Sequence, residues 1–223
     1  MARRYLQLAC ACLFPLPLAA QDFVTVPGAL SDDDFYRAVS CGAAPGTECT
    51  KPVVKWDTQR PLRVSLRQIH RTYLGGRAKR AGAALERAIQ RINAAKADLR
   101  LLRIGPNASA ADIEVYFLDQ EKGDTITGTG IEGVDGTVLG GASTRVFFDK
   151  NGRIKRAVVL YSTTMQMRAY ESSMLEEITQ SLGLLTDIRS PHYDRISVFA
   201  QDSNAATRLG PQDIMALRRH YPR

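Results

Sequence analysis

Three polar residues, Glu176, Glu177 and Gln180, share one short stretch of the chain, and Asp187 follows shortly after them. The apolar residues of this stretch recur three or four positions apart, at Met174, Ile178, Leu182 and Leu185. This period predicts an amphipathic helix that buries one face and leaves the polar residues on the other. Carboxylate oxygens are ligands that calcium, magnesium and manganese accept, and two adjacent buried carboxyls can raise each other's pKa. The stretch could therefore hold a hard cation or act as an acid–base pair.

The same residues also have structural interpretations. Ser173 and Glu176 fit the capping-box pattern S-x-x-E, whereas a helix that begins earlier would contain Ser173. Gln180 stands one turn beyond Glu176 and could be its hydrogen-bonding neighbour. Asp187 could accept hydrogen bonds from backbone amides just past the helix. The sequence leaves both kinds of interpretation open.

The spacing resembles the zinc-binding helix of metzincin peptidases, H-E-x-x-H-x-x-G. In that motif two histidines one turn apart bind the metal, and the glutamate activates a water molecule. Glu176 and Gln180 stand at the two histidine positions, and Glu177 stands at the glutamate position. Gly183, the expected end of the helix, matches the motif's glycine, and Thr186 stands where matrixin-like members carry a third histidine. The resemblance implies the fold together with a metal site whose ligands are replaced or recast.

Further motifs between Pro61 and Pro222 resemble those of matrixin-type catalytic domains. Lys122-Gly123-Asp124 is similar to the family's H-G-D, and the segment from Asp135 to Ala142 is similar to its D-G-x-x-G-x-L-A-H-A. Histidines of these two motifs bind a structural zinc in the family. Lys122 and Gly141 replace them here, so both zinc sites of the family are altered together.

Shorter matches extend the resemblance along the chain. Ala111-Asp112-Ile113 is similar to the family's strand start A-D-I, and Ser197-Val198-Phe199 resembles the Met-turn S-x-M with Phe199 in place of methionine. The segment from Leu209 to Tyr221 resembles the closing L-S-x-x-D-I-x-A-L-x-x-L-Y. Through F-Y-R-x-x-x-C-G-A-A-P-G and E-E-x-T-Q-x-L-G-L, the chain also resembles an uncharacterised proteobacterial family of exported, lipoprotein-like proteins. That second resemblance implies export and no established activity.

Apolar periodicity places these motifs on a series of strands and helices. Helices are expected at about 31–40, 77–95, 174–182 and 210–221, and strands at about 61–69, 99–104, 112–118, 144–148 and 153–162. The glycine-rich segment 123–141 is expected to form a long loop. We predict an α+β, zincin or metzincin-like fold: a mixed, twisted sheet of about five strands with three main helices, after a short N-terminal helical segment. The predicted division is a signal peptide over 1–20, an N-terminal extension with a disulfide loop over 21–60, and the metzincin-like domain over 61–223.

The first twenty residues predict export. Arg3 and Arg4 precede an apolar run that ends in Leu18-Ala19-Ala20, which is the pattern of a bacterial secretory signal. The run is too short and too rich in proline to span a membrane as a mature helix. Cys10 follows a poor lipid-attachment motif, so a lipid anchor is not expected. We expect a periplasmic or secreted protein without a membrane span.

Cys41 and Cys49 are the two cysteines that remain after removal of the predicted leader. In an oxidising compartment, two cysteines without companion metal ligands favour a disulfide, here around a Pro45-Gly46 turn. Their spacing is not C-x-x-C, so a redox role is the less favoured alternative.

Composition restricts the partners and cofactors. The 30 Lys and Arg residues outnumber the 23 Asp and Glu residues, but both signs are interspersed along the chain. Without a basic arm or interleaved aromatic residues, this balance does not favour nucleic acid as a partner. The three histidines, His70, His192 and His220, lie in distant segments. Zinc is therefore not expected, and no other cofactor is indicated.

Two functions remain open. The first is a non-catalytic exported domain, a scaffold that binds an envelope protein or a peptide, because glutamate and glutamine are poor substitutes for imidazole at zinc. The second is a hydrolase or peptidase with a recast carboxylate site, in which Glu177 is the catalytic residue and Glu176 and Asp187 assist, with a harder metal or with none. Convergence of these side chains and Gln180 on one point would give the second function its structural basis.

Overall fold

A mixed sheet with the strand order β1-β6-β7-β5-β3-β4 forms the centre of the computed structural model, which describes residues 18–20, 23–69, 75–203 and 205–223. The strands are β1 (Leu18–Ala20), β3 (Leu62–Ile69), β4 (Leu101–Ile104), β5 (Ile113–Leu118), β6 (Ala142–Phe148) and β7 (Ile154–Ser162). Strands β3, β4, β5 and β7 are parallel, whereas β6 runs antiparallel to β7 and β1 antiparallel to β6. The five strands expected from the sequence are confirmed. Strand β1 adds a sixth at the edge, within the segment expected to be the leader.

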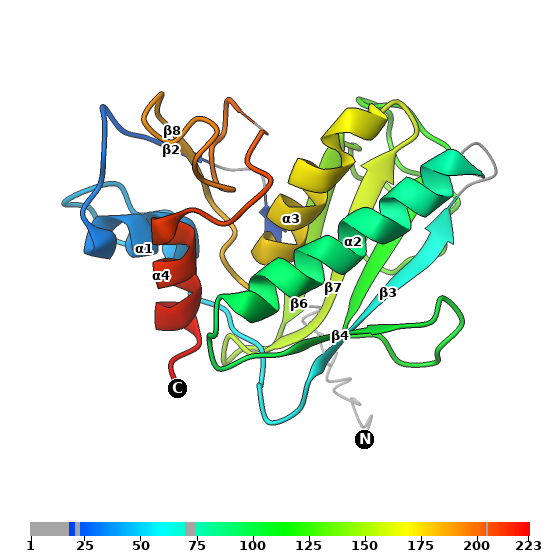
Figure 1. The fold of residues 1–223 in the computed structure, drawn as a ribbon, viewed down its shortest axis with the longest axis horizontal. Helices are drawn as coiled ribbons and strands as arrows, with labels where there is room; N and C mark the ends of the chain where they lie inside the picture. The colour runs from blue at the N-terminus through cyan, green and yellow to red at the C-terminus, as the bar shows by residue number, and fades with distance from the viewer. Residues whose placement is uncertain (1–17, 21–22, 70–74, 204) are drawn as a thin grey trace, which may run out of the picture.

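Two helices cover one face of this sheet, as Figure 1 shows: α2 (Gly76–Ala94) and α3 (Tyr170–Gln180). The buried side of α2 carries small residues, Ala81, Ala84 and Ala88, which allow close approach to its neighbours. A short 3₁₀ turn, η2 (Met167–Ala169), leads into α3. Helix α3 therefore begins earlier than the sequence pattern predicted.

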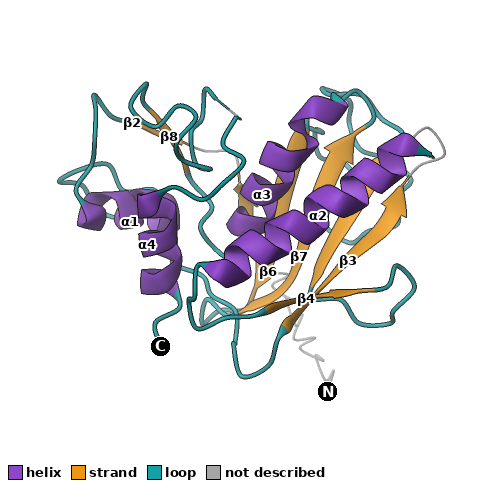
Figure 2. Cartoon of the chain, viewed as in Figure 1, coloured by secondary structure: helices purple, strands orange, loops and turns teal. Residues whose placement is uncertain are grey.

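The remaining elements lie together beside the sheet (Figure 2). Helix α1 (Asp32–Cys41) packs against α4 (Pro211–His220), and the short strands β2 (Phe23–Thr25) and β8 (Asp187–Arg189) pair in parallel. Helix α1 begins at the predicted cap, because the Ser31 hydroxyl accepts a hydrogen bond from the Asp34 amide at 3.1 Å. The β2–β8 pair was not predicted, since three residues are too few to show a period.

The opposite face of the sheet is covered by the glycine-rich segment 123–141. Alternate residues of a strand point to opposite faces, so Ala157 and Val159 join the core under the helices, while Val158 and Leu160 join a smaller cluster. The other buried members of that cluster are Leu118, Ile126, Val134 and Leu139. Across the described ranges, no helix is long and apolar enough to cross a membrane.

Candidate functional site

Helix α3 presents the polar residues singled out from the sequence. It runs from Tyr170 to Gln180, and Ala169 precedes it without a side-chain cap. Ser173 lies inside the helix and is buried, so the capping box of Ser173 with Glu176 is wrong. The reason is that η2 starts the helical path before the S-x-x-E pattern.

Gly183 ends the helical path, as predicted, and turns the chain back toward α3. Its φ angle is 97°, in the left-handed region that favours glycine. A Cβ atom at this position would lie 2.0 Å from the Val54 carbonyl oxygen. The close approach and the turn both require glycine, and together they bring β8 with Asp187 alongside the end of α3.

Two buried carboxyls meet polar partners at this place. Thr144 Oγ1 of β6 lies 2.6 Å from Glu177 Oε2 and 3.0 Å from the Glu177 backbone oxygen. Gln180 Nε2 donates a hydrogen bond to Asp187 Oδ1 at 2.8 Å. Glu177 is only 5% exposed and Asp187 only 7%. The other carboxyl oxygens, Glu177 Oε1 and Asp187 Oδ2, have no hydrogen-bond partner among the residues that the structure describes.

The four polar residues predicted from the sequence line one cavity of about 390 Å³. Glu176, Glu177 and Gln180 come from α3, and Asp187 comes from β8. The remaining lining residues are Lys122, Gly140, Gly141, Ala142, Met165, Ala200 and Gln201. Gln180 therefore bonds Asp187 rather than Glu176, and Asp187 accepts from a side chain rather than from a helix-terminal amide. The structure brings together the four residues that the sequence placed in the site, but not Thr186.

Burial sets the protonation of the pair. It raises the pKa of the Glu177 carboxyl well above its ordinary value, and the charge of Asp187 raises it further, whereas the hydrogen bond with Thr144 lowers it. Burial also raises the pKa of Asp187, against the opposing effects of the Gln180 hydrogen bond and the charge of Lys51. The two carboxyls titrate together, so the pair retains a proton near neutral pH.

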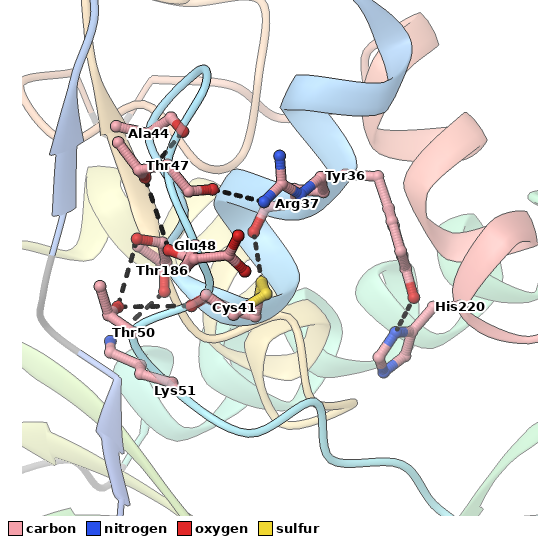
Figure 3. The surroundings of a disulfide bond; sticks show 12 residues. Tyr36, Arg37, Cys41, Ala44, Thr47, Glu48, Thr50, Lys51, Thr186 and His220 are labelled. Carbon is pink, nitrogen blue, oxygen red and sulfur yellow. Dashed lines mark hydrogen bonds between the residues drawn. A yellow bond between two sulfur atoms is a disulfide. The ribbon is translucent and has the colours of Figure 1, made fainter.

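Thr186 faces the disulfide loop instead of the cavity. Cys41 and Cys49 form the predicted disulfide. The amides of Thr50 and Lys51 both donate to the Cys41 carbonyl, at 3.0 and 3.1 Å, and Lys51 Nζ donates to Thr186 Oγ1 at 3.3 Å (Figure 3). The loop thus sets an ammonium group beside the residue that precedes Asp187.

Phe199, the residue in the Met-turn position, lies behind the cavity rather than in it. Its ring is fully buried and meets Phe35 edge-on, with the ring centres 6.1 Å apart. The Phe199 carbonyl accepts from the Ile188 amide at 2.7 Å. This bond ties the loop that supplies Ala200 and Gln201 to β8, so Phe199 supports one wall of the cavity.

The residues present do not fit a zinc site. No three side chains of His, Cys, Asp and Glu lie close enough to hold a metal ion within the described part of the chain. The Gln180 amide group is turned to Asp187 as a donor, which is the wrong polarity for a metal ligand. His192 is exposed, His220 is buried against Tyr36 and the Val54 carbonyl, and His70 lies outside the described residues.

Two residues of the site, Thr144 and Lys51, were missed by the sequence reasoning. Thr144 appeared only as the first residue of a strand, and Lys51 was not singled out. Each reaches the site through contacts with residues far away in the chain, 33 positions for Thr144 and 135 for Lys51. The alternation of β6 could have marked Thr144 as an inward-facing polar residue, whereas no local pattern marks Lys51.

Comparison with known proteins identifies a family without assigning an activity. No curated protein matches the chain significantly. Residues 31–223 match the sequence model of a family described as a protein of unknown function, DUF2927. The match covers most of the chain, including α1, the disulfide loop and every residue of the cavity. This protein therefore belongs to the DUF2927 family.

Proposed function

We propose that this protein is a non-catalytic ligand-binding domain of the bacterial cell envelope, and that the cavity at Glu177 and Asp187 is its binding site. One observation carries the proposal. Each of the two buried carboxyls has one oxygen held by a protein side chain, and its other oxygen has no hydrogen-bond partner in the described part of the chain. Neither of these two oxygens is a fully buried atom without a partner, so both are open to the cavity, and a ligand that supplies donors to both forms two hydrogen bonds there.

The scaffold proposed for this site is metzincin-like. In support, the parallel strands β4, β3, β5 and β7 are followed in the sheet by the antiparallel strand β6, with α2 and α3 on one face and α4 last in the chain. This is the order that the motif resemblance implies. Export is supported by the leader pattern and by the Cys41–Cys49 disulfide, which suits an oxidising compartment.

Fragment mapping by NMR tests the binding function. Methyl groups of Ala142, Met165 and Ala200 line the cavity and report on occupation. We expect some members of a mixed library of neutral, cationic and anionic fragments to shift these signals in the wild-type protein, and the shifts to weaken at least about tenfold in Glu177→Gln. If no fragment shifts them, the cavity is not a binding site. Glu132→Gln, the same substitution at an exposed carboxyl away from the cavity, should behave as wild type.

A second candidate function is hydrolysis by the carboxyl pair without a metal. A carboxyl whose pKa is raised toward neutrality is suited to act as a general acid, and Glu177 has that property inside a cavity. Cleavage of a diverse peptide library by the wild-type protein but not by Glu177→Gln would establish this activity. Equal rates for the two proteins, or no cleavage by either, would leave binding as the function of the site.

A further inference from the structure

We propose that Arg145 of β6 is a binding residue for a carboxylate group, on the face of the sheet opposite α2 and α3. The site is separate from the cavity at Glu177, whose lining does not include Arg145, so it stands independently of the function proposed for that cavity. Neither the sequence motifs nor the family match assign a ligand to this face of the sheet.

Arg145 is a charged side chain that is buried without a counter-ion. It is only 7% exposed, and its Nε atom is fully enclosed without a hydrogen-bond partner. Among the described residues, no carboxyl group forms an ion pair with its guanidinium group. Burial lowers the pKa of Arg145, but a guanidinium group stays protonated at neutral pH. Keeping this charge in the fold is therefore unfavourable until an anion pairs with it.

The direction of the Arg145 side chain follows from its place in β6. Successive side chains of a strand point to opposite faces, and Thr144 points to Glu177 of α3. Arg145 therefore points to the other face, where Val158 of β7 stands opposite it and belongs to the smaller apolar cluster. Phe147, on the same side of β6 as Arg145, packs against that cluster as well. These apolar neighbours leave the charge uncompensated and strengthen its attraction for an anion, because they lower the local dielectric constant.

The charged groups nearest to this face are engaged elsewhere. Asp124 and Asp135, in the segment that covers the face, accept hydrogen bonds from backbone amides close to them in the chain. The Glu132 side chain is exposed. Arg156 of β7 lies over the Phe147 ring, 4.3 Å from its centre, and donates to the Glu132 carbonyl oxygen at 2.7 Å. Within the described ranges, the counter-charge of Arg145 must therefore come from a ligand.

The two terminal nitrogens of Arg145 determine the class of this ligand. They are not among the fully enclosed atoms without a partner, so they reach the surface with their N–H groups available. Two parallel N–H groups of a guanidinium fit the two oxygens of a carboxylate. A phosphate group carries up to two negative charges, of which a single guanidinium compensates only one. The site therefore favours a carboxylate, from a peptide or from a small organic acid, over a phosphate.

Strand β1 is the neighbour of Arg145 at the edge of the sheet. Ala19 of β1 stands opposite Arg145 in the antiparallel register, and the hydrogen bonds of such a pair lie in the plane of the sheet. The Arg145 side chain points out of this plane. Removal of β1 with the predicted leader would therefore open the edge beside Arg145 and leave its place on β6 unchanged.

Two matched probes test the site. N-acetyl-glutamate methylamide and N-acetyl-glutamine methylamide have nearly the same shape, but only the first carries a carboxylate. With the side-chain Nε–H signal of Arg145 as the NMR readout, in the protein purified after export, we expect the glutamate probe to bind at least about tenfold more tightly than the glutamine probe or inorganic phosphate. Acetate distinguishes the source of the carboxylate, because binding as tight as that of the glutamate probe indicates a small organic acid and weaker binding indicates a peptide. Equal binding of the two matched probes, no binding of the glutamate probe, or tighter binding of phosphate overturns the assignment.

Variants of Arg145 separate binding from folding. With the backbone amide signal of Val146 as readout, Arg145→Met should abolish the preference for the glutamate probe. Arg145→Lys should weaken it, since lysine keeps the charge but lacks the paired N–H groups. Arg100→Met, the same substitution at an exposed arginine just before β4 at the far edge of the sheet, should leave the preference unchanged.

Thermal unfolding of the ligand-free proteins gives the second measurement. Arg145→Met should melt at a temperature at least as high as the wild type, because no described residue loses a hydrogen bond or an ion pair with the guanidinium group. A clearly lower melting temperature would show that the guanidinium group is required by the fold itself, and a retained preference in Arg145→Met would show that the carboxylate binds elsewhere. Either result overturns Arg145 as the binding residue.

Discussion

At the scale of single residues, Glu177 and Asp187 determine the chemistry of the site. Both carboxyls are largely withdrawn from water, and among the described residues each has one side-chain hydrogen-bond partner. Ionising both would leave two like charges in a region of low dielectric constant, which is unfavourable. The pair therefore keeps a proton under conditions in which exposed carboxyls have lost theirs. This property makes the stability of the fold depend on pH.

The pH dependence has a definite sign. The pKa of Glu177 is raised in the folded protein, so the folded state binds more protons than the unfolded chain. The free energy of unfolding therefore falls as pH rises from the ordinary carboxyl pKa, near 4, through the raised value. His220 acts in the opposite direction at lower pH, because burial lowers its pKa to about 3 and its contribution is lost as pH falls below about 6.5. Measurements above neutral pH separate the two effects.

We expect Glu177→Gln to flatten this pH dependence. Between about pH 7 and about pH 9 the wild-type protein should lose roughly 1 kcal/mol or more of unfolding free energy, and the variant at most half as much, since it has lost one titrating group of the pair. Urea unfolding at several pH values measures both slopes. Glu132→Gln should retain the wild-type slope. The same slope in Glu177→Gln would show that Glu177 does not titrate in this range.

At the scale of secondary-structure elements, the turn between α3 and β8 brings the residues of the site together. The helix supplies Glu177 and Gln180, and the chain must reverse within a few residues to bring Asp187 against Gln180. Gly183 makes this possible through its left-handed conformation and its approach to the Val54 carbonyl. The segment between the disulfide loop and β3, which contains Val54, therefore helps to fix the geometry of the site.

Gly183→Ala should be far more destabilising than an ordinary left-handed glycine replacement. Gly128→Ala is the matched control, because Gly128 has a φ angle of 69° and open space around it. Gly128→Ala should lower the free energy of unfolding by about 1 kcal/mol through backbone strain. Gly183→Ala should lower it by at least about 2 kcal/mol more, because the new Cβ atom would collide with Val54. Chemical denaturation of both variants measures the difference. Equal losses would mean that Val54 moves aside at little cost.

Local patterns predicted the elements better than they predicted the site. The Ser31 cap and the Gly183 stop are read from neighbouring residues, and both are confirmed. The apolar period located the helix α3, but its polar residues Glu177 and Gln180 are buried too, and the helix ends at Gln180. The start of α3 was placed too late, because η2 continues into the helix without a polar cap. Thr144 and Lys51 could not be assigned to the site, since their partners become neighbours only through the β6–α3 packing and the disulfide loop. Long-range contacts of this kind leave no periodic signal in the sequence.

At the scale of the whole molecule, the segment that precedes β3 is part of the packed structure. Phe35 and Val39 of α1 are fully buried, and α1 packs along α4 at the other end of the chain. The Trp56 indole donates to the Ser181 carbonyl at 2.8 Å, just beyond α3. The family match likewise begins at residue 31, within the segment predicted as an extension. The region 61–223 thus relies on residues 31–60 for part of its core.

A chain that begins at residue 61 should not fold cooperatively. This shortened chain lacks α1, so the face of α4 that packs against α1 would be exposed. It also lacks Trp56, so the Ser181 carbonyl would lose the hydrogen bond from the Trp56 indole. Thermal unfolding followed by circular dichroism compares the chain 61–223 with the chain 23–223. We expect a sharp transition only for the longer chain. A cooperative transition of the shorter chain at a similar temperature would show that residues 23–60 are a separable extension.

The most direct measurement on the candidate site is a ¹³C NMR titration of the Glu177 and Asp187 carboxyl groups in the wild-type protein, with signals assigned through Glu177→Gln and Asp187→Asn. A coupled, buried pair at the cavity predicts two linked steps, with the later one near or above neutral pH and dominated by Glu177. Two independent steps near pH 4 would mean that both carboxyls are solvated separately, which contradicts the pair.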